Sequence, residues 1–352
     1  MITMNKSDIQ SDAAADDDND IIKYNDEVSQ HGLMKKCFHN ICNREFLKAL
    51  LLGQFLSLLL CGTGIFTGLL AQEGVHTPAA QSFVNYVLLC LVFTVILACR
   101  YKERTFGFLL KNYWWKYLLL SLVDVEANYL AIKAYSYTTV TSVQLLDCIS
   151  LPTVMLLSAV FLRVRYHATH FTGAFICLLG SGGLIAADVL SGRNSDSQGS
   201  RQWLGDIFCV LAAILYGVSN IGQEFVVKQY DRSEFLGMVG LFGSFISGIQ
   251  FAVLERHEVE TIDFTSYKII LPWLGFLACQ FLLYTCMAII IKYTSATMAN
   301  ISILSADFYT VILGIFIFKY QFHILYFVAF FVIICGVTLY SIKPTQTRTI
   351  NS

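Results

Sequence analysis

The sequence contains two related halves, and this duplication restricts the fold more than any other feature. Between Tyr117 and Tyr340 the residues recur 156 positions later without a gap. The matching pairs are Tyr137 and Tyr293, Thr138 and Thr294, Thr141 and Thr297, Gln144 and Asn300, Arg163 and Lys319, His167 and His323, Phe171 and Phe327, Phe175 and Phe331, and Gly180 and Gly336. An internal repeat inside an apolar chain is typical of secondary transporters. The repeat therefore makes transport the leading hypothesis.

The composition indicates a membrane protein. Of the 352 residues 56% are hydrophobic and 14% are charged, and the mean hydropathy is +0.60. The net charge of −1 argues against nucleic acid as a partner, because binding phosphates needs basic patches. The eleven cysteines follow no zinc-binding spacing, so we expect packing residues and neither a metal nor another cofactor.

Ten stretches are long and apolar enough to cross a bilayer, which needs about 20 residues of helix. They are Leu47–Ala71, Ala79–Cys99, Trp115–Ala134, Thr141–Leu162, Thr169–Leu190, Trp203–Val227, Phe235–Leu254, Ile269–Ile291, Ser295–Phe318 and His323–Ile342. Five helices in each half is an odd number, so the second half must lie upside down relative to the first. The sequence predicts an all-α integral membrane protein of ten transmembrane helices in two inverted five-helix repeats.

The remaining segments are polar. We expect residues 1–45 to form a disordered cytoplasmic tail, because the tail has few apolar residues to bury. The two repeats then occupy residues 46–190 and 203–342, with a loop at 191–202 outside the cytoplasm and a short cytoplasmic tail at 343–352. This orientation follows from lysine and arginine, of which 16 lie near the membrane on the side of the N-terminus and six on the other side. Both termini are therefore predicted to be cytoplasmic.

Glycines indicate where helices approach closely in the absence of water. Gly64 and Gly68 form a GxxxG pair in the first span, and Gly237, Gly240 and Gly243 line one side of the seventh. We interpret both groups as packing surfaces.

Ionisable and amide side chains at membrane depth are costly and commonly mark a solute or proton path. The main candidates are Asp124 and Asp307, with Gln144 and Asn300 as amides related by the repeat and Tyr129 and Tyr309 as aromatic or hydroxyl partners. The further candidates are Asn128, Glu126, Asp147, Asn220, Glu224 and Tyr284. Several also have a structural interpretation: Glu224 with Lys228 and Glu126 with Lys133 have the spacing of pairs on one helix face, and Glu126 and Asp147 could hold their helices in register.

The candidate site is rich in acceptors and poor in cations. No lysine or arginine lies near the middle of a span, since Lys133, Lys228 and Lys292 fall at the predicted helix ends. A site for phosphates would need cationic side chains. Carboxylates, amides and rings instead favour a planar, neutral or weakly cationic solute, and the carboxylates could carry a coupling proton.

Four stretches resemble a known family. DVEANYLAIKAYSYTTVTSVQLLDC (Asp124–Cys148) and EFLGMVGLFGSFISGIQ (Glu234–Gln250), with WWKYLLL and QSFVNY before them, are similar to solute carrier family 35, subfamily F, of the drug/metabolite transporter superfamily. The resemblance covers nearly all of the chain after residue 45. It implies a ten-helix inverted repeat and a carrier that works by alternating access. One branch is similar to importers of modified nucleobases and nucleosides of the queuine type.

The resemblance also guides the location and the alternatives. It favours the plasma membrane, with the Golgi or another endomembrane as the alternative, because the wider family includes Golgi nucleotide-sugar antiporters. A membrane enzyme would need a catalytic group of side chains, and the seven histidines fall in tails or at helix ends. We therefore predict that the chain is not an enzyme. A membrane receptor or scaffold that binds its solute without moving it remains open.

Overall fold

The structure is a computed structural model that describes residues 44–75, 77–99, 106–134, 137, 146–190, 202–260, 262, 264, 266–306, 308–310, 313, 324–342 and 346–347. Residues Ala49–Ser352 group into one compact unit, to which the description below is confined.

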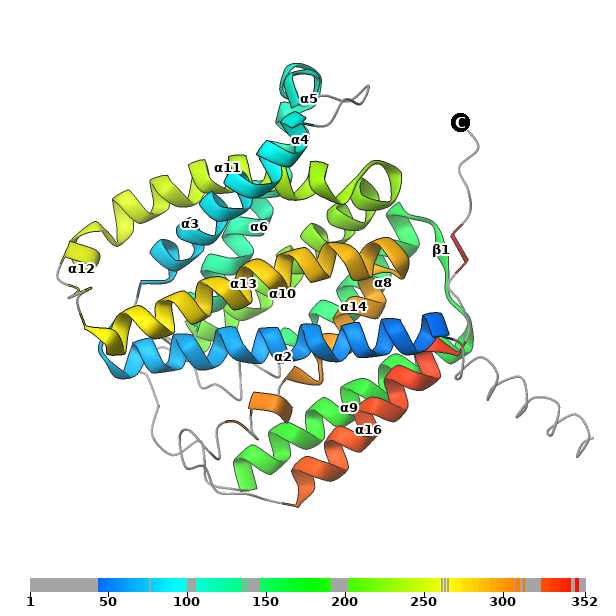
Figure 1. Cartoon of the computed structure of the whole chain (residues 1–352). Coiled ribbons are helices and arrows are strands. Elements are labelled where there is room, and N and C mark those ends of the chain that lie inside the picture. The colour runs from blue at the N-terminus through cyan, green and yellow to red at the C-terminus, as the bar shows by residue number, and fades with distance from the viewer. Residues whose placement is uncertain are drawn as a thin grey trace, which may run out of the picture. The chain divides into compact units, whose positions relative to one another are not determined.

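The described chain is almost entirely helical (Figure 1). The helices are α2 (Arg44–Gln72), α3 (Pro78–Leu89), the π-helical turn η1 (Cys90–Thr94), α4 (Val95–Cys99), α5 (Phe106–Asn112), α6 (Trp114–Ala134), α8 (Ser150–Phe161), α9 (Ala168–Leu190), α10 (Gln202–Gln229), α11 (Arg232–Leu254), α12 (Arg256–Glu260), α13 (Tyr267–Tyr293), α14 (Ala296–Ile303) and α16 (Leu325–Ser341). The strands β1 (Val164–Arg165) and β2 (Gln346–Thr347) pair antiparallel, with Val164 opposite Thr347.

Five helical segments within the described residues are long and apolar enough to cross a membrane. They are Leu50–Leu70, Pro78–Cys99, Trp203–Gln229, Arg232–Leu254 and Tyr267–Tyr293, and Ser150–Phe161 and Phe327–Ser341 are shorter apolar helices. Large apolar side chains such as Phe245, Val253 and Phe331 remain at least two-thirds exposed on these helices, as lipid contact requires. The prediction of a helical membrane protein is confirmed. Three predicted spans, Thr141–Leu162, Ser295–Phe318 and His323–Ile342, lie partly outside the described residues.

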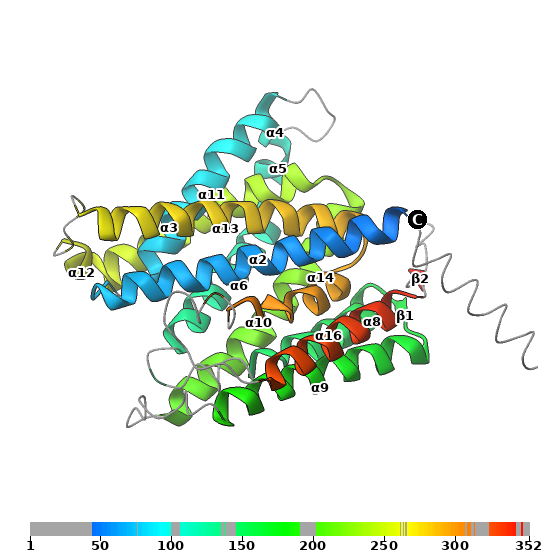
Figure 2. The ribbon, with the colours of Figure 1, turned by 60° about the horizontal axis from the view of Figure 1, so that its bottom comes forward.

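Two helix pairs pack backbone against backbone. In α9 and α16, a Cβ added to Gly173 would lie 2.7 Å from the Tyr340 nitrogen, and one added to Gly180 would lie 3.0 Å from the Ala329 oxygen. The partner residue number falls as the α9 number rises, so these two helices run antiparallel. Figures 1 and 2 both show α9 and α16 side by side.

The second close pair joins α3 and η1 to α11. Gly237 faces the Phe93 backbone, Gly240 the Cys90 backbone and Gly243 the ring of Tyr86, in the antiparallel order seen in the first pair. The packing role predicted for the three glycines of α11 is therefore confirmed. The prediction for Gly64 is wrong: an added Cβ there would meet no heavy atom within 4 Å, because the close contacts of α2 are made by Gly53 against Ser302 and Gly62 against Cys279.

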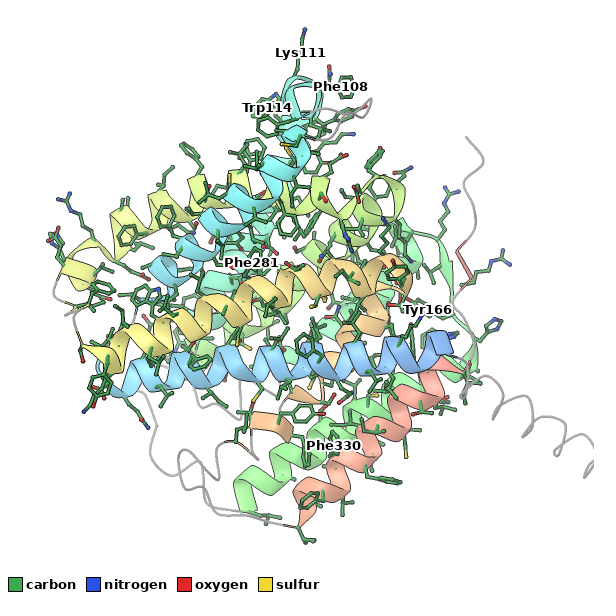
Figure 3. All side chains as sticks on the ribbon, viewed as in Figure 1. Phe108, Lys111, Trp114, Tyr166, Phe281 and Phe330 are labelled. Atoms are coloured by element: carbon green, nitrogen blue, oxygen red, sulfur yellow. The ribbon has the colours of Figure 1, made fainter. Side chains whose placement is uncertain are left out.

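The three largest of five apolar clusters form most of the core of the described unit. The largest joins α3, η1, α6, α10, α11 and α13, and Figure 3 labels one of its partly buried members, Phe281, whose ring stacks 5.9 Å from that of Phe93. A second joins α8, α9, α14 and α16, and a third joins α2, α8, α10, α13 and α14. α2 ends at Gln72; Gly74 follows with a φ of +80°, and the Val75 nitrogen donates to the Leu70 oxygen at 2.9 Å.

Candidate functional site

Asp124 is the centre of a buried polar cluster inside the largest apolar core. Its side chain is 6% exposed and accepts three hydroxyl hydrogen bonds. Tyr86 donates to Oδ2 at 2.7 Å, Tyr284 donates to the same oxygen at 2.8 Å, and Ser219 donates to Oδ1 at 2.7 Å. A carboxylate buried without such donors would cost several kcal/mol, so the three hydroxyls are what allow it to lie here.

Asn128, one turn after Asp124, extends the cluster. Its side-chain nitrogen donates to the Tyr284 hydroxyl at 2.9 Å and to the Tyr86 hydroxyl at 3.0 Å, and its side-chain oxygen accepts from Tyr216 at 3.1 Å. Asp124 and Asn128 share a face of α6 because they are four residues apart. The cluster is thus a carboxylate and an amide surrounded by three tyrosine hydroxyls and one serine hydroxyl.

Four helices bring these groups together. α3 supplies Tyr86, α6 supplies Asp124 and Asn128, α10 supplies Tyr216 and Ser219, and α13 supplies Tyr284. Gly243 on α11 has no side chain and so leaves room for the ring of Tyr86, since an added Cβ would lie 2.7 Å from that ring. The cluster can offer a solute an anionic acceptor and several hydroxyls that either donate or accept.

Two predicted candidates lie on α6 outside this cluster. Glu126 accepts a hydrogen bond from Gln250 of α11 at 2.7 Å, which replaces the suggested pairing with Lys133. Tyr129 is half-buried. Neither side chain has a described hydrogen bond to the Asp124 cluster, and Glu126 faces α11.

A second polar group joins α10 to α14. Glu224 is 1% exposed, pairs with Lys228 at 2.5 Å and accepts from the Ala296 nitrogen at 2.9 Å. Asn220 donates to Asn300 at 3.3 Å. The suggested Glu224–Lys228 pair is therefore present, and the same carboxylate also holds the start of α14.

A third polar group joins α2 to the segment after α14. Tyr309 donates to Gln54 at 2.9 Å, Gln54 donates to Ser305 at 3.1 Å, and Ser57 donates to the Ser302 oxygen at 2.6 Å. Asn300 and Tyr309 thus belong to two polar groups other than the Asp124 cluster. Asp147 is half-buried next to α8, within electrostatic range of Cys209. Gln144 and Asp307 lie outside the described residues.

Three members of the cluster, Tyr86, Tyr216 and Ser219, were not predicted from the sequence. Each is a hydroxyl residue within a predicted span, where it could equally have faced lipid or an apolar neighbour. The only available signal was the need of Asp124 and Asn128 for partners. A buried carboxylate and a buried amide require hydrogen bonds, and the helices that pack against α6 had to provide them.

Cationic side chains lie away from the cluster. Lys133, Lys228 and Lys292 fall in the last turns of α6, α10 and α13, as predicted. Lys292 lies 3.7 Å from Asp231. Among the described residues no group of three histidine, cysteine, aspartate or glutamate side chains is arranged to hold a metal ion.

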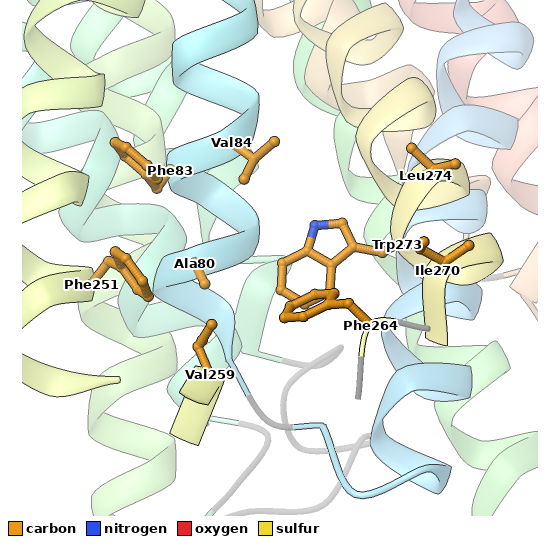
Figure 4. A pocket seen from close by; sticks show the side chains of 9 residues that line it. All are labelled: Ala80, Phe83, Val84, Phe251, Val259, Phe264, Ile270, Trp273 and Leu274. Carbon is orange, nitrogen blue, oxygen red and sulfur yellow. The ribbon is translucent and has the colours of Figure 1, made fainter. Parts of the chain in front are cut away.

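A separate apolar pocket of about 300 Å³ lies between α3 and α13 (Figure 4). Its walls include Ala80, Phe83 and Val84 of α3, Phe251 of α11, and Trp273 and Leu274 of α13. Apart from the indole nitrogen of Trp273 these side chains offer no polar atom, so the pocket does not suit a hydrogen-bonding solute.

Apolar spanning helices that enclose a polar, carboxylate-centred site define a multi-pass membrane protein of the transporter class. Comparison with known proteins agrees, since the family model described as Solute carrier family 35 (SLC35F) matches residues 42–342. The chain belongs to solute carrier family 35 and is a membrane transporter.

Similar proteins come from distant organisms. The chain is 49% identical over 304 residues to solute carrier family 35 member F2 of Mus musculus, covering 86% of this chain and 80% of that protein. It is 35% identical over 313 residues to an uncharacterized family 35 member of Schizosaccharomyces pombe, covering 89% and 61%. A putative chloroquine resistance transporter of Plasmodium yoelii yoelii is 26% identical over 202 residues, covering 55% and 46%. One crystal structure shares the fold at 15% identity, with a TM-score of 0.64 over 83% of this chain and 96% of that one.

Proposed function

We propose that this transporter moves a small planar, neutral or weakly cationic organic solute, of the modified nucleobase or nucleoside type represented by queuine and queuosine, by alternating access. The observation that carries the proposal is the Asp124 cluster. A carboxylate held by hydroxyls from three other helices can exchange those hydroxyls for the ring N–H groups or amine of such a solute. Charge-assisted hydrogen bonds of this kind are the strong ones in a site of low dielectric.

Direct contacts between repeat-related residues support an inverted repeat. Asn128 and Tyr284 are 156 positions apart and are hydrogen-bonded, as are Cys177 and the Ile333 oxygen. Two equivalent residues can touch only near the axis that relates their halves. α9 and α16 are equivalent under the same shift and run antiparallel, which is the expected relation between inverted halves. We infer a ten-helix arrangement in which the Asp124 cluster lies at this axis.

Alternating access follows from that arrangement, because rocking of inverted halves around a central site exposes the site to each side in turn. The distribution of lysine and arginine supports cytoplasmic termini, and the plasma membrane is the proposed location. The proposed ligands are Asp124, Asn128 and Tyr284, with Asp307 and Gln144 proposed from the sequence alone. We also propose a proton as the coupling ion, carried by an acidic side chain of the site.

The test is uptake of labelled queuine by cells that express the chain, at two external pH values. The variants are Asp124→Asn and Asp307→Asn, matched for surface level, with Glu260→Gln as a matched control. Glu260 is 58% exposed on α12 and pairs with Arg256 of its own helix, so losing its charge should leave uptake intact. We expect saturable uptake that falls at least about tenfold in Asp124→Asn, the loss expected when an ionic hydrogen bond becomes a neutral one.

Other outcomes would redirect the proposal. Equal uptake by Asp124→Asn and by the unchanged protein would show that the Asp124 carboxylate takes no part in transport. Uptake that does not depend on pH would exclude a proton as the coupling ion. An absence of queuine uptake at normal surface level would overturn the substrate class, and nucleotide-sugar exchange in Golgi vesicles would then be measured.

A further inference from the structure

α3 carries a polar face whose acceptor atoms have no donor. Thr77, Gln81 and Asn85 are 1%, 2% and 1% exposed. Thr77 Oγ1, Gln81 Oε1 and Asn85 Oδ1 have no hydrogen-bond partner among the described residues. Buried acceptors without donors cost free energy, and native interiors contain few of them. Three on one helix therefore require a physical reason.

The spacing arranges these acceptors as a track. Residues four apart lie on one face of a helix, and eight residues rise about 12 Å. The track begins at the start of α3 and ends at Asn85, directly before Tyr86, whose hydroxyl donates to Asp124. It therefore leads from one end of α3 to the candidate site.

Glu255 binds the first turn of α3, where this row of acceptors begins. It caps the end of α11 and is 5% exposed, and its two carboxylate oxygens accept from the Ala79 and Ala80 nitrogens at 2.9 Å each. These N–H groups belong to the first turn of α3, where no backbone acceptor within the helix is available and the helix dipole is positive. The carboxylate thus holds the first turn of α3 against the end of α11.

The other end of α3 has the features of a hinge. The π-helical turn η1 follows directly, and such turns are frequent at functional bends. The turn is held against α11, since a Cβ on Gly240 would lie 2.5 Å from the Cys90 nitrogen. A tilt of α3 about η1 would keep this backbone contact, and it would move the ring of Phe83 along α11, where it stacks 5.9 Å from that of Phe251.

Space for such a tilt lies beside α3. The apolar pocket in Figure 4 has a volume of about 300 Å³ and separates Ala80 and Val84 of α3 from Trp273 and Leu274 of α13. The first turns of α3 can move into this space until they meet the rings of Trp273 and Phe264, which line it.

Unpartnered polar atoms continue beyond the site. Ser121 Oγ and Gln223 Nε2 have no partner among the described residues, and each lies about one turn from a residue of the Asp124 cluster. α6 runs parallel to α11, because Tyr117 donates to Glu234 and Glu126 accepts from Gln250, and α11 runs antiparallel to α3. α6 is therefore antiparallel to α3. Ser121 therefore lies on the side of Asp124 away from Glu255.

We infer that the segment Pro78–Leu89 is the movable wall of the solute's access path. It tilts about η1 when Glu255 releases its first turn, and Thr77, Gln81 and Asn85 then accept hydrogen bonds from water and from the donor groups of the solute. In the present structure this path is closed. The inference rests on the proposed transport function and names the helix that opens one side of the site.

The test uses Gln81→Cys and Asn85→Cys, separately, in open membrane fragments treated with a charged, water-soluble methanethiosulfonate. Peptide mass spectrometry locates and times the modification. The internal control is Cys177, which is 0% exposed between α9 and α16. We expect both new cysteines to react at least about tenfold faster than Cys177, because local opening exposes groups that are buried in the closed state.

A second pair of variants tests the fastening. Glu255→Ala leaves the Ala79 and Ala80 N–H groups without their acceptor and should raise both labelling rates several-fold. Glu260→Ala removes an equal side chain from α12 and should leave them unchanged. Val84→Phe fills the pocket and should lower the labelling rates of both cysteines. This variant provides the same test if Glu255→Ala does not elute as a monodisperse protein.

Two results would overturn the inference. The first is that the cysteines at positions 81 and 85 react no faster than Cys177. The second is that Glu255→Ala and Glu260→Ala give equal labelling rates while Val84→Phe does not change them. The labelling needs no solute. A failed labelling test therefore leaves the uptake result standing, and a failed uptake test leaves the movement of α3 standing.

Discussion

At the residue scale, the energetics of Asp124 are set by its donors. Each hydroxyl bond replaces part of the hydration that the carboxylate loses inside the core, and hydrogen bonds to charged groups are worth about 1.5–3 kcal/mol. Tyr86 and Tyr284 share one carboxylate oxygen, and both also accept from Asn128. A solute that takes the place of one tyrosine therefore affects the other through Asn128.

Tyr284→Phe should weaken solute binding without unfolding the protein. The variant keeps the ring but removes the donor to Asp124 and the acceptor for Asn128. We expect KM for uptake to rise about tenfold, equivalent to about 1.4 kcal/mol. Tyr216→Phe is the matched comparison, because Tyr216 bonds Asn128 at 3.1 Å and has no bond to Asp124 among those described. An equal or larger effect of Tyr216→Phe would argue against Asp124 as the contact.

Sequence reasoning could predict half of this cluster. Asp124 and Asn128 were predictable because charge or amide groups in an apolar span need a reason, and Tyr284 was predicted as an aromatic ring of the cavity. Tyr86, Tyr216 and Ser219 were not, since hydroxyl residues are inexpensive in a helix and only the packing register decides whether they face the core. Asn300 was predicted through its repeat relation to Gln144, and Tyr309 as a stacking or hydroxyl partner. In the structure Asn300 bonds Asn220 of α10 and Tyr309 bonds Gln54 of α2, in other polar groups.

At the element scale, the α9–α16 pair depends on the absence of side chains. Gly173→Ala should lower the free energy of unfolding by about 1–3 kcal/mol, since its methyl group would overlap the Tyr340 backbone at 2.7 Å. Gly182→Ala on the same helix meets no heavy atom within 4 Å and should be neutral or mildly stabilising. Thermal unfolding in detergent measures both, and equal transition temperatures for the two variants would contradict the close packing.

Helix positions followed well from apolar length, and local irregularities did not. α2 begins at Arg44 and α10 at Gln202, within three residues of the predicted starts. The π-helical turn inside Ala79–Cys99 left no mark in the hydropathy pattern, because it changes hydrogen bonding and not residue type. Gly64 failed as a packing marker for a related reason: a glycine spacing does not say which face of the helix meets a partner.

At the scale of the whole molecule, the orientation can be tested directly. Epitope tags at the two ends of the chain should react with antibody only after cells are permeabilised, and a tag within residues 191–200 should react on intact cells. The expectation rests on 16 basic residues against six, a bias that sets topology during insertion. Reaction of either terminal tag on intact cells would reverse the proposed orientation.

The sequence predicted a helical membrane protein, and a shift of 156 residues relates α9 to α16 and α6 to α13. The contacts between such related helices were beyond sequence reasoning, because a repeat shows which segments are alike and not which ones touch. The contacts Asn128–Tyr284 and Cys177–Ile333 supplied that missing information.

The Glu255 contact breaks the equivalence of the halves. The residue 156 positions before Glu255 is Cys99, which has no carboxylate, so the corresponding end of α4 cannot make the same fastening. Under the alternating access and the α3 movement proposed above, the two sides of the carrier open at unequal cost, and an empty carrier spends unequal time facing each compartment. Such a bias leaves the final concentration ratio of the solute unchanged. It determines which side of the membrane the empty protein faces for longer. Transport from that compartment then reaches a high rate at a lower solute concentration.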